Sequence, residues 1–337
     1  MKIVRVPYLL LLIFLIFSCD SKQEVKNIQT YDHPVFREPD IAALTQKISA
    51  SPENAKLYFQ RGLLLVAKGE DTFAVKDFQQ AAALDSTKAE YFSAVGDLLF
   101  EHKDVSGSLP WIEKALSLNP NDAKARLKVA KVLVFIKEYP KAFAEINTVL
   151  RANAMVPEGY FLKGLIYKDL KDTAKAISSF QTTLQVDPAY RDAMIQLGTI
   201  YSLKNDPLAL KYFDNAFRED SSDVFPLYAS GMFYQQQQKY EEAKEWYHKV
   251  VLRNREYHDA YFAMGYILIQ QDSFEKAHRQ FDLVTKLDPT SAKAYYNRGL
   301  CSELLGNNKE ALEDYKQALV FKGDYPEASE GVKRLGK

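Results

Sequence analysis

The spacing of apolar residues along the chain indicates paired helices. Between residues 292 and 325 these residues recur every three or four positions in two stretches, which Gly306, Asn307 and Asn308 separate. The apolar positions are Tyr295, Tyr296, Leu300, Leu304, Ala311, Leu312, Tyr315 and Leu319. Spacings of three and four place side chains on one face of an α-helix, and a Gly-Asn-Asn run is typical of a turn. The segment therefore predicts a helix, a turn and a second helix.

Glycine marks the same pattern along most of the chain. Seven of the 14 glycines lie in one register, with steps of 34 residues except for a single step of 33, and Ala130 fills the one gap. These glycines are Gly62, Gly96, Gly164, Gly198, Gly231, Gly265 and Gly299. A fixed period of this length is typical of repeat proteins, in which each helix pair packs against the next. We therefore expect an array of repeats.

Alanine and aromatic residues form two further columns. Twelve residues after the glycine most units carry alanine, and four residues later most carry a ring. The alanines are Ala74, Ala142, Ala176, Ala243, Ala277 and Ala311. The rings are Phe78, Phe180, Phe213, Tyr247, Phe281 and Tyr315. We expect the small residues where two backbones approach closely, and the rings in the space between units.

Three units end with proline, at Pro120, Pro188 and Pro289. Together, the Gly, Tyr, Ala, Phe and Pro columns at a period of 34 residues resemble the tetratricopeptide repeat. The resemblance covers residues 55–325 and implies an all-α fold, a right-handed α-solenoid of about eight helix-turn-helix units. The units are 55–88, 89–122, 123–156, 157–190, 191–223, 224–257, 258–291 and 292–325. Apolar residues flanking this array predict an N-terminal capping helix within 38–54 and a C-terminal capping helix within 326–337.

The first residues of the chain predict export. Lys2 and Arg5 precede an apolar run from Val6 to Phe17. This arrangement is typical of a signal peptide, and the run is shorter than the roughly 20 residues that a membrane-spanning helix needs. An ordinary cleaved signal and a short uncleaved anchor are the alternatives to the lipoprotein signal described next.

The end of the apolar run, Ile16-Phe17-Ser18-Cys19, resembles the lipobox of bacterial lipoproteins. That resemblance implies a signal peptide at residues 1–18 and acylation of Cys19. More than one acyl chain on Cys19 would hold the protein firmly in a membrane. Polar residues over 19–37 predict a lipidated N-terminus followed by a flexible tether. We therefore expect the body in the periplasm or at the cell surface of a bacterial envelope, with the outer membrane favoured and the inner membrane not excluded.

The composition and motifs argue against several functions. The 44 Lys and Arg residues balance 44 Asp and Glu residues, so no overall charge attracts nucleic acid. The sequence contains no phosphate loop, no His-Glu-x-x-His and no Gly-x-Ser-x-Gly motif. His248 and His258 fall on different expected helices, which makes solvated surface histidines the better interpretation than a metal site. We therefore expect no enzymatic activity, no metal and no cofactor.

In the family that the chain resembles, the first helix of each unit lines a concave surface. The early part of that surface carries charges, including Asp97, Glu101, Lys124 and Lys131. The late part predicts a partner-binding groove formed by Phe225, Tyr228, Met232, Phe262, Tyr266, Ile269, Tyr296 and Leu300. Aromatic residues and Met often anchor protein interfaces. Packing of these rings between neighbouring helices is an equally weighted alternative.

The expected partners are other envelope proteins and, through acylated Cys19, the membrane. A scaffold that gathers such proteins is the first hypothesis, and a binding module for a glycan or cell-wall fragment is the alternative, with Tyr228, Tyr266 and Tyr296 as sugar platforms. Some members of the family hold the carboxyl end of a chaperone with Lys and Asn on first helices. The fifth residues of the eight units are Phe59, Ser93, Leu127, Phe161, Ile195, Tyr228, Phe262 and Tyr296. None is Lys, so such a clamp is not expected.

Overall fold

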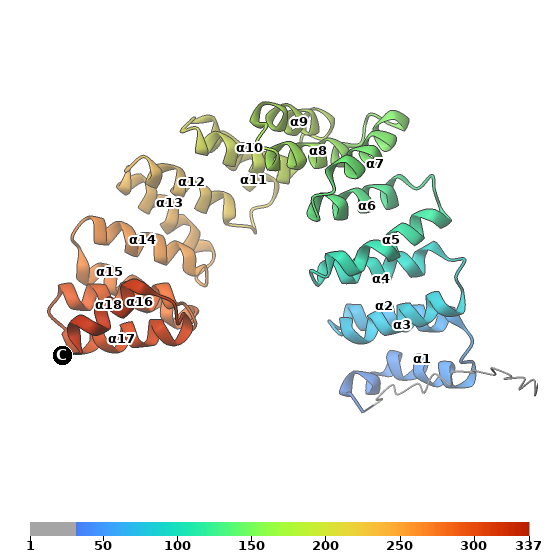
Figure 1. Ribbon diagram of the computed structural model, residues 1–337, viewed down its shortest axis with the longest axis horizontal. Coiled ribbons are helices and arrows are strands. Elements are labelled where there is room, and N and C mark those ends of the chain that lie inside the picture. The colour runs from blue at the N-terminus through green and yellow to red at the C-terminus, as the bar shows by residue number, and fades with distance from the viewer. Residues whose placement is uncertain (1–31, 337) are drawn as a thin grey trace, which may run out of the picture. The chain divides into compact units, whose positions relative to one another are not determined.

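The computed structural model describes residues 32–336, which contain helices and no strand (Figure 1). The all-α fold predicted from the repeat pattern is therefore confirmed. The chain divides into two compact units, one ending at Asp85 and the other beginning at Ser86. The signal peptide at 1–18, Cys19 and most of the predicted tether lie outside the described residues. No helix in the described range is long and apolar enough to cross a membrane.

The N-terminal unit consists of η1 (Pro34–Arg37), α1 (Pro39–Ala50), α2 (Ala55–Ala67) and α3 (Asp71–Leu84). The C-terminal unit consists of α4 (Ala89–Glu101), α5 (Val105–Leu118), α6 (Ala123–Phe135), α7 (Tyr139–Ala152), α8 (Pro157–Asp169), α9 (Thr173–Val186), α10 (Arg191–Leu203), α11 (Leu208–Glu219), α12 (Phe225–Gln236), α13 (Tyr240–Arg253), α14 (His258–Gln270), α15 (Phe274–Leu287), α16 (Ala292–Leu304), α17 (Asn308–Phe321) and α18 (Pro326–Leu335). Within each unit, each α-helix packs on the next one along the chain. This sequential packing is what stacked helix pairs require.

A left-handed residue ends the first helix of every pair. Its φ angle is 63° at Lys137, 54° at Asn205 and 75° at Gly69. The column comprises Gly69, Lys103, Lys137, Lys171, Asn205, Gln238, Asp272 and Gly306. The amide of the next residue donates to a carbonyl five positions earlier, as in the 2.8 Å bond from Glu138 N to Leu133 O. This is a Schellman motif, which closes the helix and starts the turn.

The aromatic column packs on the glycine of its own repeat. A Cβ atom placed on Gly231 would lie 2.5 Å from Cε1 of Tyr247, and one placed on Gly164 would lie 2.4 Å from Cε1 of Phe180. The ring therefore packs within its own repeat as well, in the volume that a side chain on the glycine would need. At Gly299 the small residue does lie close to another backbone, because a Cβ atom placed there would lie 3.1 Å from the carbonyl oxygen of Ala311.

The predicted tether requires a correction at its end. Pro34–Arg37 forms the 3-10 helix η1, and the side chains of Val35 and Phe36 are buried. The ring of Phe36 packs edge-on against Phe73, with centroids 5.2 Å apart. Polar composition suggested a tether up to residue 37, but the two apolar side chains bind this segment to the folded N-terminal unit.

Candidate functional site

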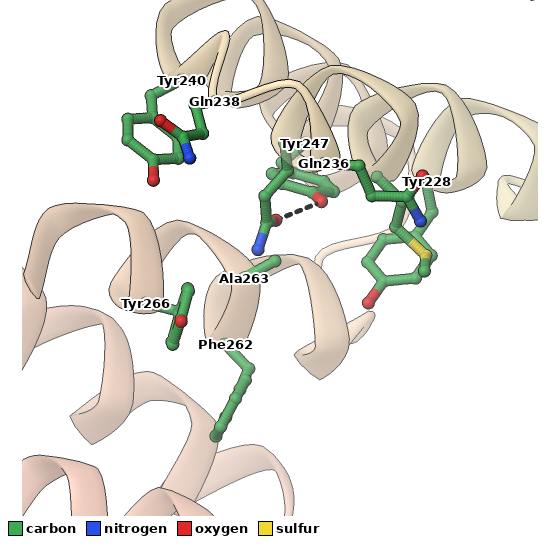
Figure 2. Close-up of a pocket in the computed structure, with 10 residues that line it drawn as sticks. Tyr228, Gln236, Gln238, Tyr240, Tyr247, Phe262, Ala263 and Tyr266 are labelled. Atoms are coloured by element: carbon green, nitrogen blue, oxygen red, sulfur yellow. Dashed lines mark hydrogen bonds between the residues drawn. The ribbon is translucent and has the colours of Figure 1, made fainter. Parts of the chain in front are cut away.

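A pocket of about 500 Å³ lies along α12 and α14 in the C-terminal unit (Figure 2). We call it the late pocket. Its lining residues are Tyr228, Met232, Gln235, Gln236, Gln238, Tyr240, Tyr247, Phe262, Ala263 and Tyr266. Figure 2 shows Phe262, Ala263 and Tyr266 on one helix, across the pocket from Tyr228 and Gln236. All ten residues are uncharged, so the pocket offers apolar surface and hydrogen-bonding groups without a net charge.

Four of the eight residues predicted for the late groove line this pocket: Tyr228, Met232, Phe262 and Tyr266. The other four, Phe225, Ile269, Tyr296 and Leu300, do not. Phe225 is the first residue of α12. Ile269 packs against a core cluster of Ala277, Phe281 and Cys301. Tyr296 and Leu300 lie on α16, in the next helix pair. The eight predicted residues therefore do not form one site, because only half of them line the late pocket.

Several of the predicted rings pack against other rings. The Tyr228 ring lies 5.4 Å from that of Tyr247 and 5.3 Å from that of Tyr257, measured between centroids. Burial, with a smaller contribution from the nearby Asp259 carboxylate, raises the pKa of Tyr228 to about 12. Phe262 likewise packs on a ring of its own repeat, that of Phe281 at 5.3 Å. The rings of Tyr228 and Phe262 therefore pack within their own repeats as well as lining the pocket.

Tyr296, in the next repeat, also packs against other rings. Its ring lies 5.6 Å from that of Tyr315 and 5.1 Å from that of Tyr325, and burial is the main cause of its raised pKa. By contrast, Met232 is 39% exposed and Tyr266 is 44% exposed, and both line the late pocket. Because they keep free apolar surface beside a cavity, these two are the candidate anchors for a ligand.

A partly buried hydrogen bond orders one polar group of the late pocket. The hydroxyl of Tyr247 donates to Oε1 of Gln235 at 2.6 Å. Since the oxygen of this amide is engaged, its nitrogen is the group that can donate to a ligand. Gln236 and Gln238 add two further amides to the lining. Side-chain amides both donate and accept hydrogen bonds, so they suit the backbone of a peptide.

Gln238, Tyr240 and Tyr247 are among the lining residues that were not predicted from the sequence. Gln238 is the left-handed residue after α12, and Tyr240 begins α13, so neither belongs to the face of a first helix. Tyr247 did carry a signal, because it has a hydroxyl where four of the eight repeats have Phe. That hydroxyl needs a partner when the ring is buried, which points to a polar residue nearby.

The late pocket lacks the groups that most enzymes use. It contains no carboxylate, no histidine and no cysteine. Among residues 32–336, no group of three or more His, Cys, Asp or Glu side chains is arranged to hold a metal ion. His248 lies on α13 and His258 on α14, and they do not form such a group. The arrangement is suited to binding an uncharged segment by contact and hydrogen bonding.

Comparison with known families supports the repeat interpretation. Models of the tetratricopeptide repeat match residues 157–190, 226–257, 258–291 and 292–325. The late pocket lies within the second and third of these matches. These four segments of the chain are therefore tetratricopeptide repeats.

Individual relatives are distant. The chain is 24% identical to the DnaJ homolog subfamily C member 7 homolog of Dictyostelium discoideum, over 68% of this chain and 39% of that protein. It is also 24% identical to the Hsp70-Hsp90 organizing protein of Triticum aestivum, over 75% of this chain and 43% of that protein. The chain thus spans less than half the length of these two relatives. The crystal structure of yeast Tom70 superposes with a TM-score of 0.57 at 15% identity, covering 79% of this chain and 60% of that one, which shows a shared fold.

Proposed function

We propose that the protein is a membrane-anchored scaffold that binds a segment of a partner protein in the late pocket. Tetratricopeptide repeat proteins generally mediate interactions between proteins. The observation that supports this site is the exposure of Met232 and Tyr266 in an uncharged cavity between first helices. When a partner covers large apolar side chains that face solvent in a cavity, the loss of their contact with water stabilises the complex.

The proposed ligand is a short uncharged segment with apolar side chains. Its apolar groups contact Met232 and Tyr266, and its backbone bonds to the amides of Gln235, Gln236 and Gln238. A segment with several charges would lose hydration in this pocket without finding an opposite charge. A chaperone carboxyl end is a poor candidate for the same reason, although the Triticum relative is named as an organizer of chaperones.

The late-pocket proposal predicts that the double variant Met232→Ser and Tyr266→Ser loses its partner. The two side chains are partly exposed, so the substitution removes contact surface while leaving the buried rings in place. Affinity purification from cross-linked envelopes should lose specific proteins from this variant, at least tenfold by quantitative mass spectrometry. Circular dichroism should show an unchanged helix content.

A matched control is the double variant Leu252→Ser and Val320→Ser, on α13 and α17. These two residues are 65% and 72% exposed and lie outside the late pocket. The control should retain the same proteins as the natural chain. Equal retention by the pocket variant and the natural chain would disprove binding in the late pocket. If the pocket variant loses cell-wall fragments that the natural chain retains, and loses no protein, the ligand is a glycan.

The proposal also places the protein in a bacterial envelope, attached through acylated Cys19, with the outer membrane favoured. This part rests on Lys2 and Arg5, on the apolar run that follows them and on its lipobox-like ending at Cys19. The variant Cys19→Ala should lose metabolically incorporated palmitate and move from the membrane fraction to the soluble fraction. A Cys301→Ala variant is the control, because Cys301 is buried in α16 and should not carry lipid. Unchanged lipid labelling of Cys19→Ala would contradict the proposal.

A further inference from the structure

A second pocket, of about 720 Å³, lies along α4 and α6 in the C-terminal unit. We call it the early pocket. Its lining residues are Asp97, Phe100, Glu101, Lys103, Ile112, Lys124, Lys128, Lys131, Val132, Phe135 and Glu158. None of them lines the late pocket. The two sites therefore use separate residues, and they differ in chemistry because seven of the residues here carry a charge.

Positive charge is concentrated on α6. This helix carries Lys124, Arg126, Lys128 and Lys131 and no acidic residue. Arg126 is paired with Glu145. Lys128 is paired with Asp97, with 2.6 Å between Nζ and Oδ2. Within residues 32–336, no ion pair engages the ammonium groups of Lys124 and Lys131, so these two cations of α6 line the cavity without an ion-pair partner.

An exposed ring lies beside these cations. The side chain of Phe135 is 65% exposed, although it lines the early pocket. Its ring packs edge-on against Phe100, with centroids 5.5 Å apart. The ammonium of Lys131 lies over the Phe100 ring, 5.4 Å from its centroid. The contact holds this cation next to apolar surface, so a ligand can meet both at once.

We infer that the early pocket binds an acidic protein segment that also carries an apolar side chain. Carboxylates of the segment pair with Lys124 and Lys131, and its apolar side chain covers Phe135. Glu101 and Glu158 also line the pocket, so the ligand meets both signs of charge. A peptide can place neutral or basic residues opposite these carboxylates, whereas a nucleic acid or an anionic membrane presents repeated negative charge and is repelled by them.

The inference gives the scaffold two sites of different specificity. The late pocket is uncharged and the early pocket is charged, so one segment cannot satisfy both equally well. The chain could then hold two partners together on one C-terminal unit. The early site stands on its own residues and does not depend on occupation of the late pocket.

The test uses an array of short immobilised peptides incubated with the full-length protein. Each peptide carries two acidic residues, Asp or Glu, together with Phe, Leu or Ser and otherwise neutral residues, and a counterpart carries Asn and Gln in place of Asp and Glu. The protein should bind acidic peptides containing Phe or Leu at least tenfold better than their amide counterparts, and high salt should weaken this binding. The double variant Lys124→Glu and Lys131→Glu should lose it.

Two controls make the outcome specific. The double variant Lys211→Glu and Lys276→Glu makes the same charge change on exposed residues of α11 and α15, and it should bind as the natural chain does. The late-pocket variant Met232→Ser and Tyr266→Ser should also keep acidic binding. Helix content measured by circular dichroism should be the same in all variants.

The inference is overturned if acidic peptides bind no better than their amide counterparts, or if the control charge variant loses binding as strongly. It is also overturned if the late-pocket variant loses acidic binding. Vesicles of anionic lipid and a single-stranded oligonucleotide provide the remaining comparison. If either competes away the acidic peptides and depends on Lys124 and Lys131 more strongly than they do, the early pocket is a site for polyanions.

Discussion

Replacing Asp77 with Ala is expected to lower the free energy of unfolding of the N-terminal unit by about 3–5 kcal/mol. Asp77 accepts two hydrogen bonds from Arg61, from Nε and from Nη2, each 2.7 Å long. The two side chains are 1% and 0% exposed. Without the carboxylate, the guanidinium stays in the core and loses the acidic partner of its ion pair, and removing one partner of a buried pair is costly.

Urea unfolding followed by circular dichroism measures this effect. The variant Glu53→Ala removes a carboxylate from an exposed residue between α1 and α2, and its unfolding free energy should change by less than about 0.5 kcal/mol. Replacing both partners, as Arg61→Met with Asp77→Leu, should restore most of the lost stability because no charge is then buried. A cost below about 1 kcal/mol for Asp77→Ala would show that the pair is not important for folding.

The same arrangement recurs in the last helix pair. Arg298 contacts Asp314 through Nε and Nη2, at 2.9 and 2.7 Å, and its Nη1 reaches Asp282. In both pairs the arginine directly precedes the glycine of the repeat register, and the aspartate follows 16 residues after the arginine. The intervening repeats have other residues in the arginine column, mainly apolar ones. An Arg–Asp pair thus marks the first and the eighth repeat, and it is buried in the first and partly buried in the eighth.

The sequence predicted the helix pairs well because local packing rules act in every repeat. A glycine such as Gly164 is required where a ring would clash with any side chain, so it recurs in register. The turn geometry was not predictable at Lys137, because a lysine in the left-handed region carries none of the signal that Gly69 and Gly306 carry. There the surrounding helix pair imposes a conformation that the residue itself disfavours.

The candidate sites were less predictable than the fold. Helical spacing indicates which residues share a face, but it does not show which neighbours cover them. Tyr296 is covered by Tyr325, the last residue before the closing helix α18, and so it packs in a core instead of in the late pocket. The early pocket depends on Phe135, which is exposed although it lines the pocket, and this exposure is not visible in the spacing of residues.

Replacing Gly231 with Ala is expected to destabilise the C-terminal unit by about 1–3 kcal/mol. In an ordinary exposed helix this change would raise stability by up to about 1 kcal/mol. Here the new methyl group would lie 2.5 Å from Cε1 of Tyr247, closer than two carbon atoms can approach. The Tyr247 ring is fully buried, and its hydroxyl is bonded to Gln235, so the ring has no free space to enter.

A double-mutant cycle separates this clash from other effects. In a Tyr247→Leu background the side chain opposite Gly231 is smaller, so Gly231→Ala should cost at least about 1 kcal/mol less than in the natural chain. Thermal and urea unfolding provide the measurement. Displacement of the Tyr247 ring also breaks the bond that orders Gln235, and partner retention by the late pocket should therefore fall in Gly231→Ala even where the protein stays folded. If Gly231→Ala instead raises the unfolding midpoint, the ring does not pack on this glycine, and Tyr247 cannot be what positions Gln235 in the late pocket.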